Sequence, residues 1–70
     1  MYTYDKLRGL IRQYFTTQAK YADYLDIGTT TLNSRLNSET FFTQKEIEKS
    51  IKAFNLMTAE EIEETFFTKE

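Results

Sequence analysis

The feature that most constrains the fold is a helical repeat of apolar residues near the start of the chain. Within residues 4–15 the repeat runs i, i+3, i+4, i+7 and i+8, as Leu7, Leu10, Ile11, Tyr14 and Phe15. This spacing places the five side chains on one face of an α-helix. Thr3 or Asp5 is expected to cap the start of this helix. Residues 4–15 therefore predict an amphipathic helix that packs against other elements.

The composition favours a chain that is helical throughout. The 70 residues contain no proline and two glycines, and strand-like alternation is absent at useful length. A chain of this length predicts one domain, residues 1–70, around a single modest core. Cysteine is absent, so neither a disulfide nor a thiolate metal site supplements that core. No apolar run is long enough for a membrane span or a signal segment, and we expect a cytoplasmic protein without a membrane partner.

Residues 17–37 predict two short helices joined by a tight turn. The first runs from Gln18 to about Leu25, with Thr17 as its N-cap. Asp26-Ile27-Gly28 forms the turn, because aspartate tolerates the left-handed conformation that such a corner demands. The second helix runs from Thr29 to about Leu36, with Gly28 as N-cap. The side chains expected to face the core are Tyr21, Ala22, Leu25, Ile27, Leu32 and Leu36.

Two capping boxes predict the remaining helices. Thr43-Gln-Lys-Glu46 precedes one apolar stripe, and Thr58-Ala-Glu-Glu61 precedes another. Asn55 suits the end of the first of these two helices. The side chains expected to be buried in them are Ile47, Ile51, Phe54, Ile62 and Phe66. The chain thus predicts an all-α fold of five helices with short connections.

Charge is divided unevenly along the chain. The formal net charge is −2, which is unfavourable for a protein that contacts phosphate. Residues 1–38 hold five basic and three acidic groups, a net +2, whereas residues 39–70 hold four basic and eight acidic groups, a net −4. This asymmetry is compatible with a nucleic-acid face on the N-terminal half.

The candidate site is a stripe of small polar side chains on the predicted helix over residues 29–36. The spacing i, i+1, i+4, i+5 and i+8 places them on one helical face, and they are Thr29, Thr30, Asn33, Ser34 and Asn37. Lysine and glutamate are more typical of a solvated helix face. Small hydrogen-bonding groups suit a helix that lies in the DNA major groove. The competing interpretation is an ordinary solvated surface.

The stretch from residue 17 to 37 resembles the helix-turn-helix of phage repressor and Cro proteins, which have a lambda-repressor-like fold of five helices. The features that carry the resemblance are Gln18 at a helix start, the small Ala22, and the corner at Asp26. The segments Leu32-Asn-Ser-Arg-Leu-Asn37, Phe42-Thr-Gln-Lys-Glu-Ile47 and Glu60-Glu-Ile-Glu-Glu-Thr-Phe-Phe67 resemble a subgroup of small regulators from phages and mobile elements of Gram-positive bacteria. The corner departs from the family pattern, since glycine is usual there.

The resemblance implies a set of DNA contacts. The first exposed residues of the recognition helix read bases, while Gln18 and Asn37 contact the phosphate backbone. Arg35 stands where the wider family commonly has an apolar residue, and if Leu36 takes the buried role, Arg35 reaches toward phosphate. The DNA-contacting residues expected from this comparison are Gln18, Thr29, Thr30, Asn33, Ser34, Arg35 and Asn37.

Two functions from different classes follow as expectations. The first is a sequence-specific DNA-binding regulator, a Cro-like repressor of a phage lysis/lysogeny switch, acting in the bacterial host as a homodimer on a palindromic double-stranded operator. The second is a small modulator that binds a separate phage repressor protein through its acidic, aromatic C-terminal half. Enzyme chemistry is disfavoured because histidine, cysteine and a glycine-rich phosphate loop are absent, and no cofactor or metal is expected.

Two further groups of side chains each have two possible roles. The basic residues of the first helix form either a solvated face or a contact to phosphate, and they are Lys6, Arg8 and Arg12. The C-terminal aromatic residues belong either to the core or to a dimer or partner surface, and they are Phe41, Phe42, Phe66 and Phe67. The glutamates at positions 60–64 have a structural explanation as helix N-terminal residues.

Overall fold

The structure, a computed structural model, describes residues 2–69 of the chain. Within these residues it contains five helices, α1 (Asp5–Phe15), α2 (Gln18–Leu25), α3 (Thr29–Leu36), α4 (Gln44–Ala53) and α5 (Ala59–Phe66). No strand accompanies them in the described range, where the β-type pairing is a single isolated bridge. None of the helices between residues 2 and 69 combines the length and apolar character needed to cross a membrane. The all-α prediction with five helices is confirmed.

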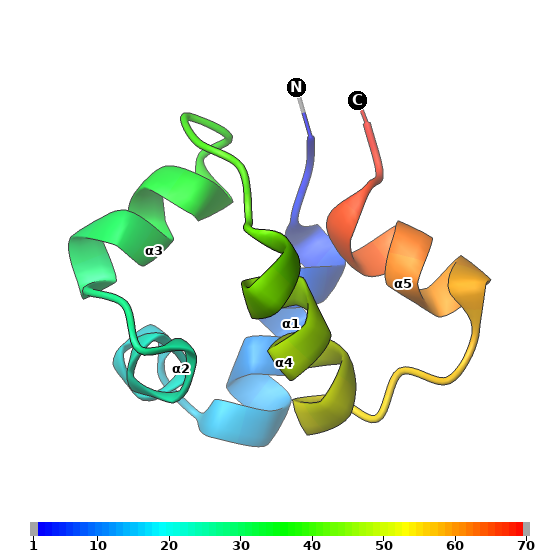
Figure 1. Cartoon of the computed structure of the whole chain (residues 1–70), viewed down its shortest axis with the longest axis horizontal. Helices are drawn as coiled ribbons and strands as arrows, with labels where there is room; N and C mark the ends of the chain where they lie inside the picture. The colour runs from blue at the N-terminus through cyan, green and yellow to red at the C-terminus, as the bar shows by residue number, and fades with distance from the viewer. Residues whose placement is uncertain (1, 70) are drawn as a thin grey trace.

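Helix α1 lies at the centre of the arrangement (Figure 1). It packs against α2 and α5, and α2 in turn packs against α3 and α4. The buried apolar residues come from all five helices or the segments next to them: Tyr4, Leu7, Ile11, Tyr21, Ala22, Leu25, Leu32, Leu36, Phe54, Leu56 and Phe66. Helix α3 stands at one edge of the molecule, so one of its faces is left to solvent.

The two ends of the described chain lie side by side (Figure 1). The Thr3 N–H donates to the Thr68 carbonyl over 2.8 Å, and Tyr2 and Lys69 form an antiparallel bridge. This pairing brings the Tyr4 ring into the core, where it is 3% exposed. Neither Tyr2 nor Tyr4 stands out in the sequence, because both precede the helix and fall outside its apolar repeat.

Helix α1 departs from prediction at its start and on its apolar face. Tyr4 occupies the N-cap position and no side chain caps the helix, so the expectation for Thr3 or Asp5 was wrong. Leu7 and Ile11 are buried as predicted, whereas Tyr14 is 48% exposed. The Tyr14 ring rests against Phe54 at 5.6 Å between centroids and presents its other side to solvent.

The helix ends use left-handed residues other than glycine. Asp26, Ser38 and Asn55 have φ of 63°, 62° and 56°. After Asp26, the Ile27 N–H donates to the Ala22 carbonyl over 3.0 Å, which closes the C-terminal turn of α2 as in a Schellman motif. The corner predicted at Asp26 is confirmed, and aspartate adopts the conformation that glycine would adopt at less steric cost.

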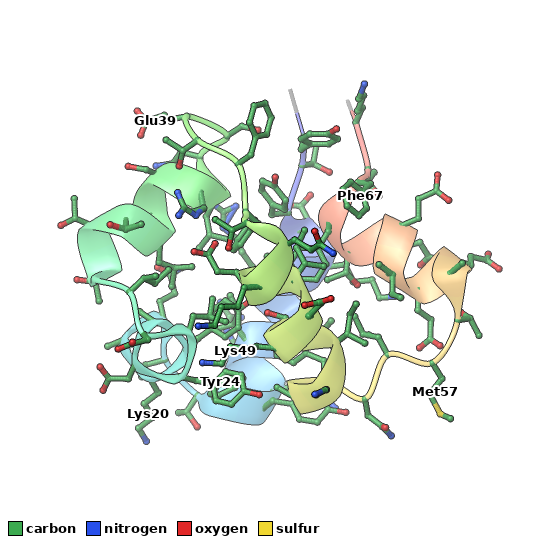
Figure 2. All side chains as sticks on the ribbon, viewed as in Figure 1. Lys20, Tyr24, Glu39, Lys49, Met57 and Phe67 are labelled. Atoms are coloured by element: carbon green, nitrogen blue, oxygen red, sulfur yellow. The ribbon has the colours of Figure 1, made fainter. Side chains whose placement is uncertain are left out.

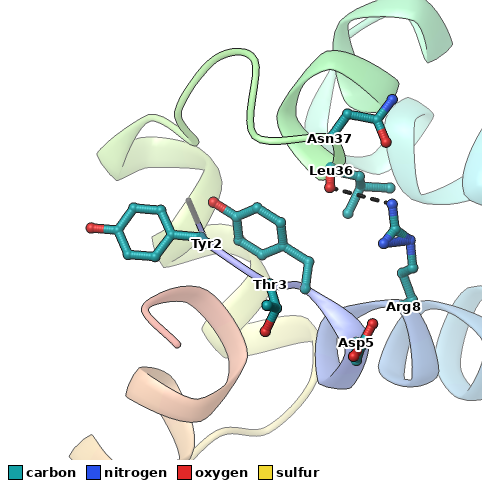
Figure 3. A pocket seen from close by; sticks show the side chains of 7 residues that line it. Tyr2, Thr3, Asp5, Arg8, Leu36 and Asn37 are labelled. Carbon is teal, nitrogen blue, oxygen red and sulfur yellow. Dashed lines mark hydrogen bonds between the residues drawn. The ribbon is translucent and has the colours of Figure 1, made fainter. Parts of the chain in front are cut away.

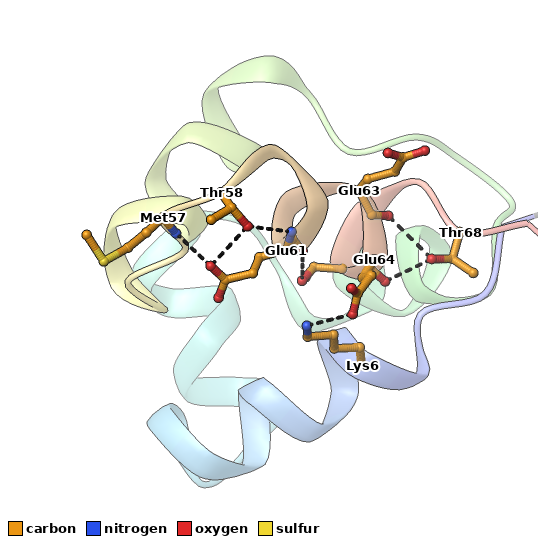
Figure 4. A network of polar contacts seen from close by, with 8 residues as sticks. Lys6, Met57, Thr58, Glu61, Glu63, Glu64 and Thr68 are labelled. Carbon is orange, nitrogen blue, oxygen red and sulfur yellow. Dashed lines mark hydrogen bonds and ion pairs between the residues drawn. The ribbon is translucent and has the colours of Figure 1, made fainter.

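The two predicted capping boxes differ in completeness. At α4 the box is complete, since Thr43 accepts from the Glu46 N–H and the Glu46 carboxylate accepts from the Thr43 N–H. At α5 the Thr58 hydroxyl accepts from the Glu61 N–H over 3.1 Å. The Glu61 carboxylate instead accepts from the Met57 N–H and the Thr58 hydroxyl (Figure 4). The second box is therefore only half formed.

The inward face of α4 is more polar than predicted. Ile47 and Ile51 are only partly buried, whereas Glu46 and Ser50 are 6% and 0% exposed. Ser50 tolerates burial because its hydroxyl donates to the Glu46 carbonyl over 2.8 Å and is hydrogen-bonded to the Tyr21 hydroxyl of α2. The helical period predicted a buried face one residue away from the observed one, and it did not predict that Glu46 and Ser50 would be buried there.

Candidate functional site

The turn between α2 and α3 sets the orientation of the candidate site. The Asp26 N–H donates to the Asp23 carbonyl and the Ile27 N–H to the Ala22 carbonyl, each over 3.0 Å. Ala22 is 1% exposed, because α3 packs closely over this part of α2. Gly28 then starts α3 as an N-cap residue without a side chain. The two helices are thereby held at a sharp corner.

Helix α3 has one buried face and one solvated face. Leu32 and Leu36 are 0% and 4% exposed, and they anchor the helix on the core. The candidate stripe lies opposite: Thr29, Thr30, Asn33 and Asn37 are exposed and Ser34 is partly buried. Within residues 2–69, none of these five side chains takes part in a hydrogen bond. Their donors and acceptors are available to a ligand outside the protein.

The N-terminus of α2, at the opposite end of the helix from this corner, is exposed to solvent. Gln18 is the first helical residue and its side chain is solvent-exposed. Thr17 caps the helix by accepting from the Lys20 N–H over 3.2 Å. Lys20 extends from α2 into solvent (Figure 2). A helix N-terminus with an amide and an ammonium group nearby is a suitable place for an anionic oxygen.

Arg35 does not lie on the exposed face of α3. Its Nε donates to Glu46 Oε1 over 2.8 Å, and its second terminal nitrogen donates to Glu46 Oε2 over 3.1 Å. The remaining terminal nitrogen donates to the Thr40 hydroxyl over 2.9 Å. Leu36 is buried as expected, but Arg35 turns inward and pairs with α4. Arg35 thus has a structural role between α3 and α4, and the phosphate contact expected for it stays a prediction.

This ion pair is well shielded and alters both pKa values. The side chains of Arg35 and Glu46 are 15% and 8% exposed. Burial by itself raises the pKa of Glu46, but the hydrogen bonds from Arg35 and from the Thr43 N–H outweigh it, so the pKa lies below its ordinary value of 4.5. The same hydrogen bond raises the pKa of Arg35. Both groups stay charged near neutral pH and join α3 to α4.

A basic side chain from α1 approaches the C-terminal end of α3. The Arg8 guanidinium donates to the Leu36 carbonyl over 3.3 Å, which satisfies a backbone acceptor at the end of the helix. Arg8 and Asn37 line a cavity of about 240 Å³ together with Asp5 (Figure 3). Sequence reasoning placed Arg8 on a general basic face and missed this position, because α1 and α3 meet only in the tertiary structure.

The electrostatic environment of the stripe is mixed. Arg8 lies near the C-terminal end of the stripe. Lys20 extends from α2 into solvent, and Glu39 projects from the loop that follows α3 (Figure 2). Asp23 and Asp26 are also exposed at the corner. Among residues 2–69, no three acidic, histidine or cysteine side chains are grouped as metal ligands would be. The arrangement offers neutral hydrogen-bonding groups along α3, with the Arg8 cation at its C-terminal end.

Comparisons with known proteins place the chain in a family. A family model with the description "Protein of unknown function (DUF739)" matches residues 1–69. A search of curated proteins finds no match to the chain. The match extends over all five helices, so family membership applies to the whole described structure.

Proposed function

Since the chain belongs to the DUF739 family, we propose its function from the geometry of α2 and α3: a sequence-specific DNA-binding transcriptional regulator. The observation that carries the proposal is the exposed stripe on α3, whose hydrogen-bonding groups have no partner among residues 2–69. The turn at Asp26 fixes the start of the helix, and the buried Leu32 and Leu36 hold its opposite face on the core. This combination suits a helix that enters the major groove while the preceding helix rests on the backbone.

Base recognition is assigned to the stripe. Thr29 and Thr30 form the first turn of α3, and Asn33 and Ser34 form the second. An asparagine amide pairs well with the N6 and N7 positions of adenine, and threonine methyl groups contact the methyl of thymine. Asn33 is the side chain in this set best suited to discriminate one base pair from another.

Phosphate contacts are assigned to both ends of the site. Gln18 and Lys20 lie at the N-terminus of α2, where the helix dipole also favours an anion. Asn37 lies at the other end, beside Arg8. Arg8 uses one terminal nitrogen on the Leu36 carbonyl, and its other N–H groups remain for a phosphate oxygen. Arg8 is thus the cation proposed for this end.

The small size of α3 makes a homodimer part of the proposal. Eight residues of helix span about 12 Å, so one subunit reads only a few base pairs. Two copies on a palindromic operator would double the contacts and provide the affinity that a mildly basic surface lacks. Together with the resemblance to Cro and repressor proteins, this supports the role of a repressor in a phage lysis/lysogeny switch.

The proposal is tested by selecting binding sites from a random double-stranded DNA library and titrating the selected duplex. Anisotropy measured at about 50 and 200 mM salt should show tight binding that weakens steeply as salt rises. Asn33→Ala should lower the preference for one base pair by roughly tenfold or more, a loss of about 1–3 kcal/mol. Gln18→Ala should weaken all duplexes to a similar extent.

Gln44→Ala provides the matched control, because Gln44 is an exposed amide on α4, a helix that carries none of the proposed DNA contacts. Its affinity and sequence preference should equal those of the wild-type protein. An unenriched library, or an Asn33→Ala protein with unchanged preference, would refute the assignment of α3 to the groove.

A further inference from the structure

Helix α5 carries an apolar groove on the side of the molecule away from α3. Ala59, Ile62, Glu63 and Phe67 line a volume of about 420 Å³. Phe67 is 45% exposed although it is a large aromatic residue, and it stands out beside the chain ends (Figure 2). Apolar surface that remains open on a folded protein is typical of a site for another molecule.

The apolar surface continues beyond the groove. The Phe67 ring meets the Tyr2 ring edge-on at 6.2 Å between centroids, and Tyr2 meets Phe41 in the same way at 6.2 Å. Phe41 is 70% exposed. A row of rings therefore extends from α5 to the loop between α3 and α4. This aromatic row borders the groove at Phe67, and the Lys69 ammonium group lies over its Tyr2 ring at 5.5 Å from the centroid.

One acidic residue, Glu63, lines the groove, and α5 carries three further glutamates outside the lining, Glu60, Glu61 and Glu64. Glu64 forms an ion pair with Lys6 over 3.0 Å, and Glu61 is held in the cap of α5. Glu63 points away from the Lys6 pair (Figure 4). Within residues 2–69, neither Glu60 nor Glu63 belongs to an ion pair. Their charge is uncompensated next to an apolar surface, where a cation would be favoured.

The charge distinguishes between possible occupants of the groove. A two-fold contact whose axis passes through the groove would bring Glu63 of one copy close to Glu63 of the other. Like charges brought together in an apolar contact are strongly unfavourable. A partner segment with apolar anchors and flanking lysine or arginine residues would fill the groove and neutralise Glu63.

We propose that the groove on α5 binds a basic amphipathic segment of a separate protein. The apolar side chains of the segment lie against Ile62 and Phe67, and its cations face Glu63 in the groove and Glu60 one turn earlier on the same helix. The groove between Ala59 and Phe67 lies on the side of the molecule away from α3, so the proposal does not depend on DNA binding. It gives the acidic C-terminal half of the chain a task separate from that of the N-terminal half.

The test uses synthetic peptides as probes. One peptide of about 14 residues carries leucine at helical spacing and lysine elsewhere, and its counterpart carries glutamate in place of lysine. Each is titrated into the isotope-labelled full chain and followed by amide chemical shifts. We expect the lysine peptide to bind and to shift the amides of Ala59, Ile62, Glu63 and Phe67, while the glutamate peptide does not bind.

Variants separate this groove from general attraction between opposite charges. Glu63→Lys and Phe67→Ala should each lower the affinity for the lysine peptide by roughly tenfold. Glu48→Lys makes the same charge change on the exposed surface of α4, and Met57→Ala removes another exposed apolar side chain. These two control variants should retain affinity within about twofold. Circular dichroism establishes that all four variants keep the helical fold.

Three results would overturn the proposal. The first is the absence of binding by the lysine peptide. The second is equal weakening by Glu63→Lys and Glu48→Lys, which would mean that only net charge matters. The third is a homodimer in sedimentation equilibrium that Phe67→Ala dissociates, which would identify a second copy as the occupant. If the protein failed to bind DNA, only the proposed function would be contradicted. The peptide experiments involve no DNA and would still test the groove.

Discussion

Glu46 shows how much a single residue contributes to the candidate site. Its carboxylate accepts from Arg35 of α3 and from the Thr43 N–H at the start of its own helix. The local sequence predicted only the second of these bonds, because a capping box is recognised from residues three positions apart. The partner on α3 is 11 positions away and is brought close by folding.

The first prediction concerns the charge of Glu46. Glu46→Gln removes the ion pair and should lower the free energy of unfolding by about 2 kcal/mol at neutral pH, between the values typical of exposed and buried pairs. Because the pKa of Glu46 is lower in the folded state than in the unfolded state, its stabilisation is present above the unfolded-state pKa and is lost as pH falls through the folded-state pKa. Urea unfolding of the wild-type and Glu46→Gln proteins, from neutral pH to about pH 3, measures their free energies of unfolding.

As pH falls from the ordinary carboxyl pKa of 4.5 through the lower folded-state pKa of Glu46, the wild-type and Glu46→Gln proteins should converge in stability. Glu48→Gln on the exposed side of the same helix should stay within about 0.5 kcal/mol of wild type at every pH. A difference between wild type and Glu46→Gln that persists unchanged at acid pH would show that packing, rather than charge, explains the loss.

At the scale of elements, α2 and α4 are joined by a buried polar contact. The Ser50 hydroxyl donates its one hydrogen to the Glu46 carbonyl, so the Tyr21 hydroxyl must donate to Ser50. Burial raises the pKa of Tyr21 well above its ordinary value, although the bond to Ser50 opposes the shift. Tyr21 therefore remains a neutral donor throughout the accessible pH range.

The second prediction follows from the direction of that hydrogen bond. Ser50→Ala leaves the buried Tyr21 O–H without an acceptor and should cost about 2 kcal/mol of unfolding free energy. Tyr21→Phe removes the hydroxyl and leaves the Ser50 bond to Glu46 intact, so it should cost about 1 kcal/mol. Thermal or urea unfolding ranks the two variants. The double variant should cost less than the sum of the single ones, and strict additivity would contradict the contact.

Helix α3 illustrates what local pattern predicts and what it omits. Its bounds, its buried leucines and its N-cap agree with the sequence prediction, because each depends on residues within one or two turns. Its polar connections to the rest of the molecule were not predicted. They come from Arg8 of α1, Glu46 of α4 and Tyr2 before α1. These contacts join residues distant in sequence, and no periodicity marks them.

At the scale of the whole molecule, the N-terminal segment connects α3 with the C-terminus. The Tyr2 N–H donates to the Ser38 hydroxyl over 3.1 Å, just beyond the end of α3. The Tyr2 ring contacts Tyr4, Phe41 and Phe67 at 6.2–6.3 Å between centroids. A residue that carries no helical signal thus holds three parts of the chain together.

The third prediction concerns this connection. Tyr2→Ala should lower the free energy of unfolding by about 2 kcal/mol, because it removes several aromatic contacts at once. Hydrogen exchange should accelerate at Thr3, whose N–H bonds to the Thr68 carbonyl, and in the loop that contains Phe41. Met57→Ala, at a residue that is 78% exposed, should change stability by less than about 0.5 kcal/mol. Equal free energies of unfolding for the Tyr2→Ala and wild-type proteins would show that the aromatic row of Phe67, Tyr2 and Phe41 does not stabilise the fold.

The sequence by itself determined the five helices, the corner at Asp26 and the polar stripe on α3, because propensity, capping and helical period act between residues a few positions apart. Only the tertiary structure decided that Arg35 turns toward Glu46, that Arg8 reaches the end of α3, and that Phe67 stays exposed. These outcomes depend on which helix faces meet. Several pairings of amphipathic helices satisfy the same local pattern, and packing and hydrogen bonding across the whole chain select one of them.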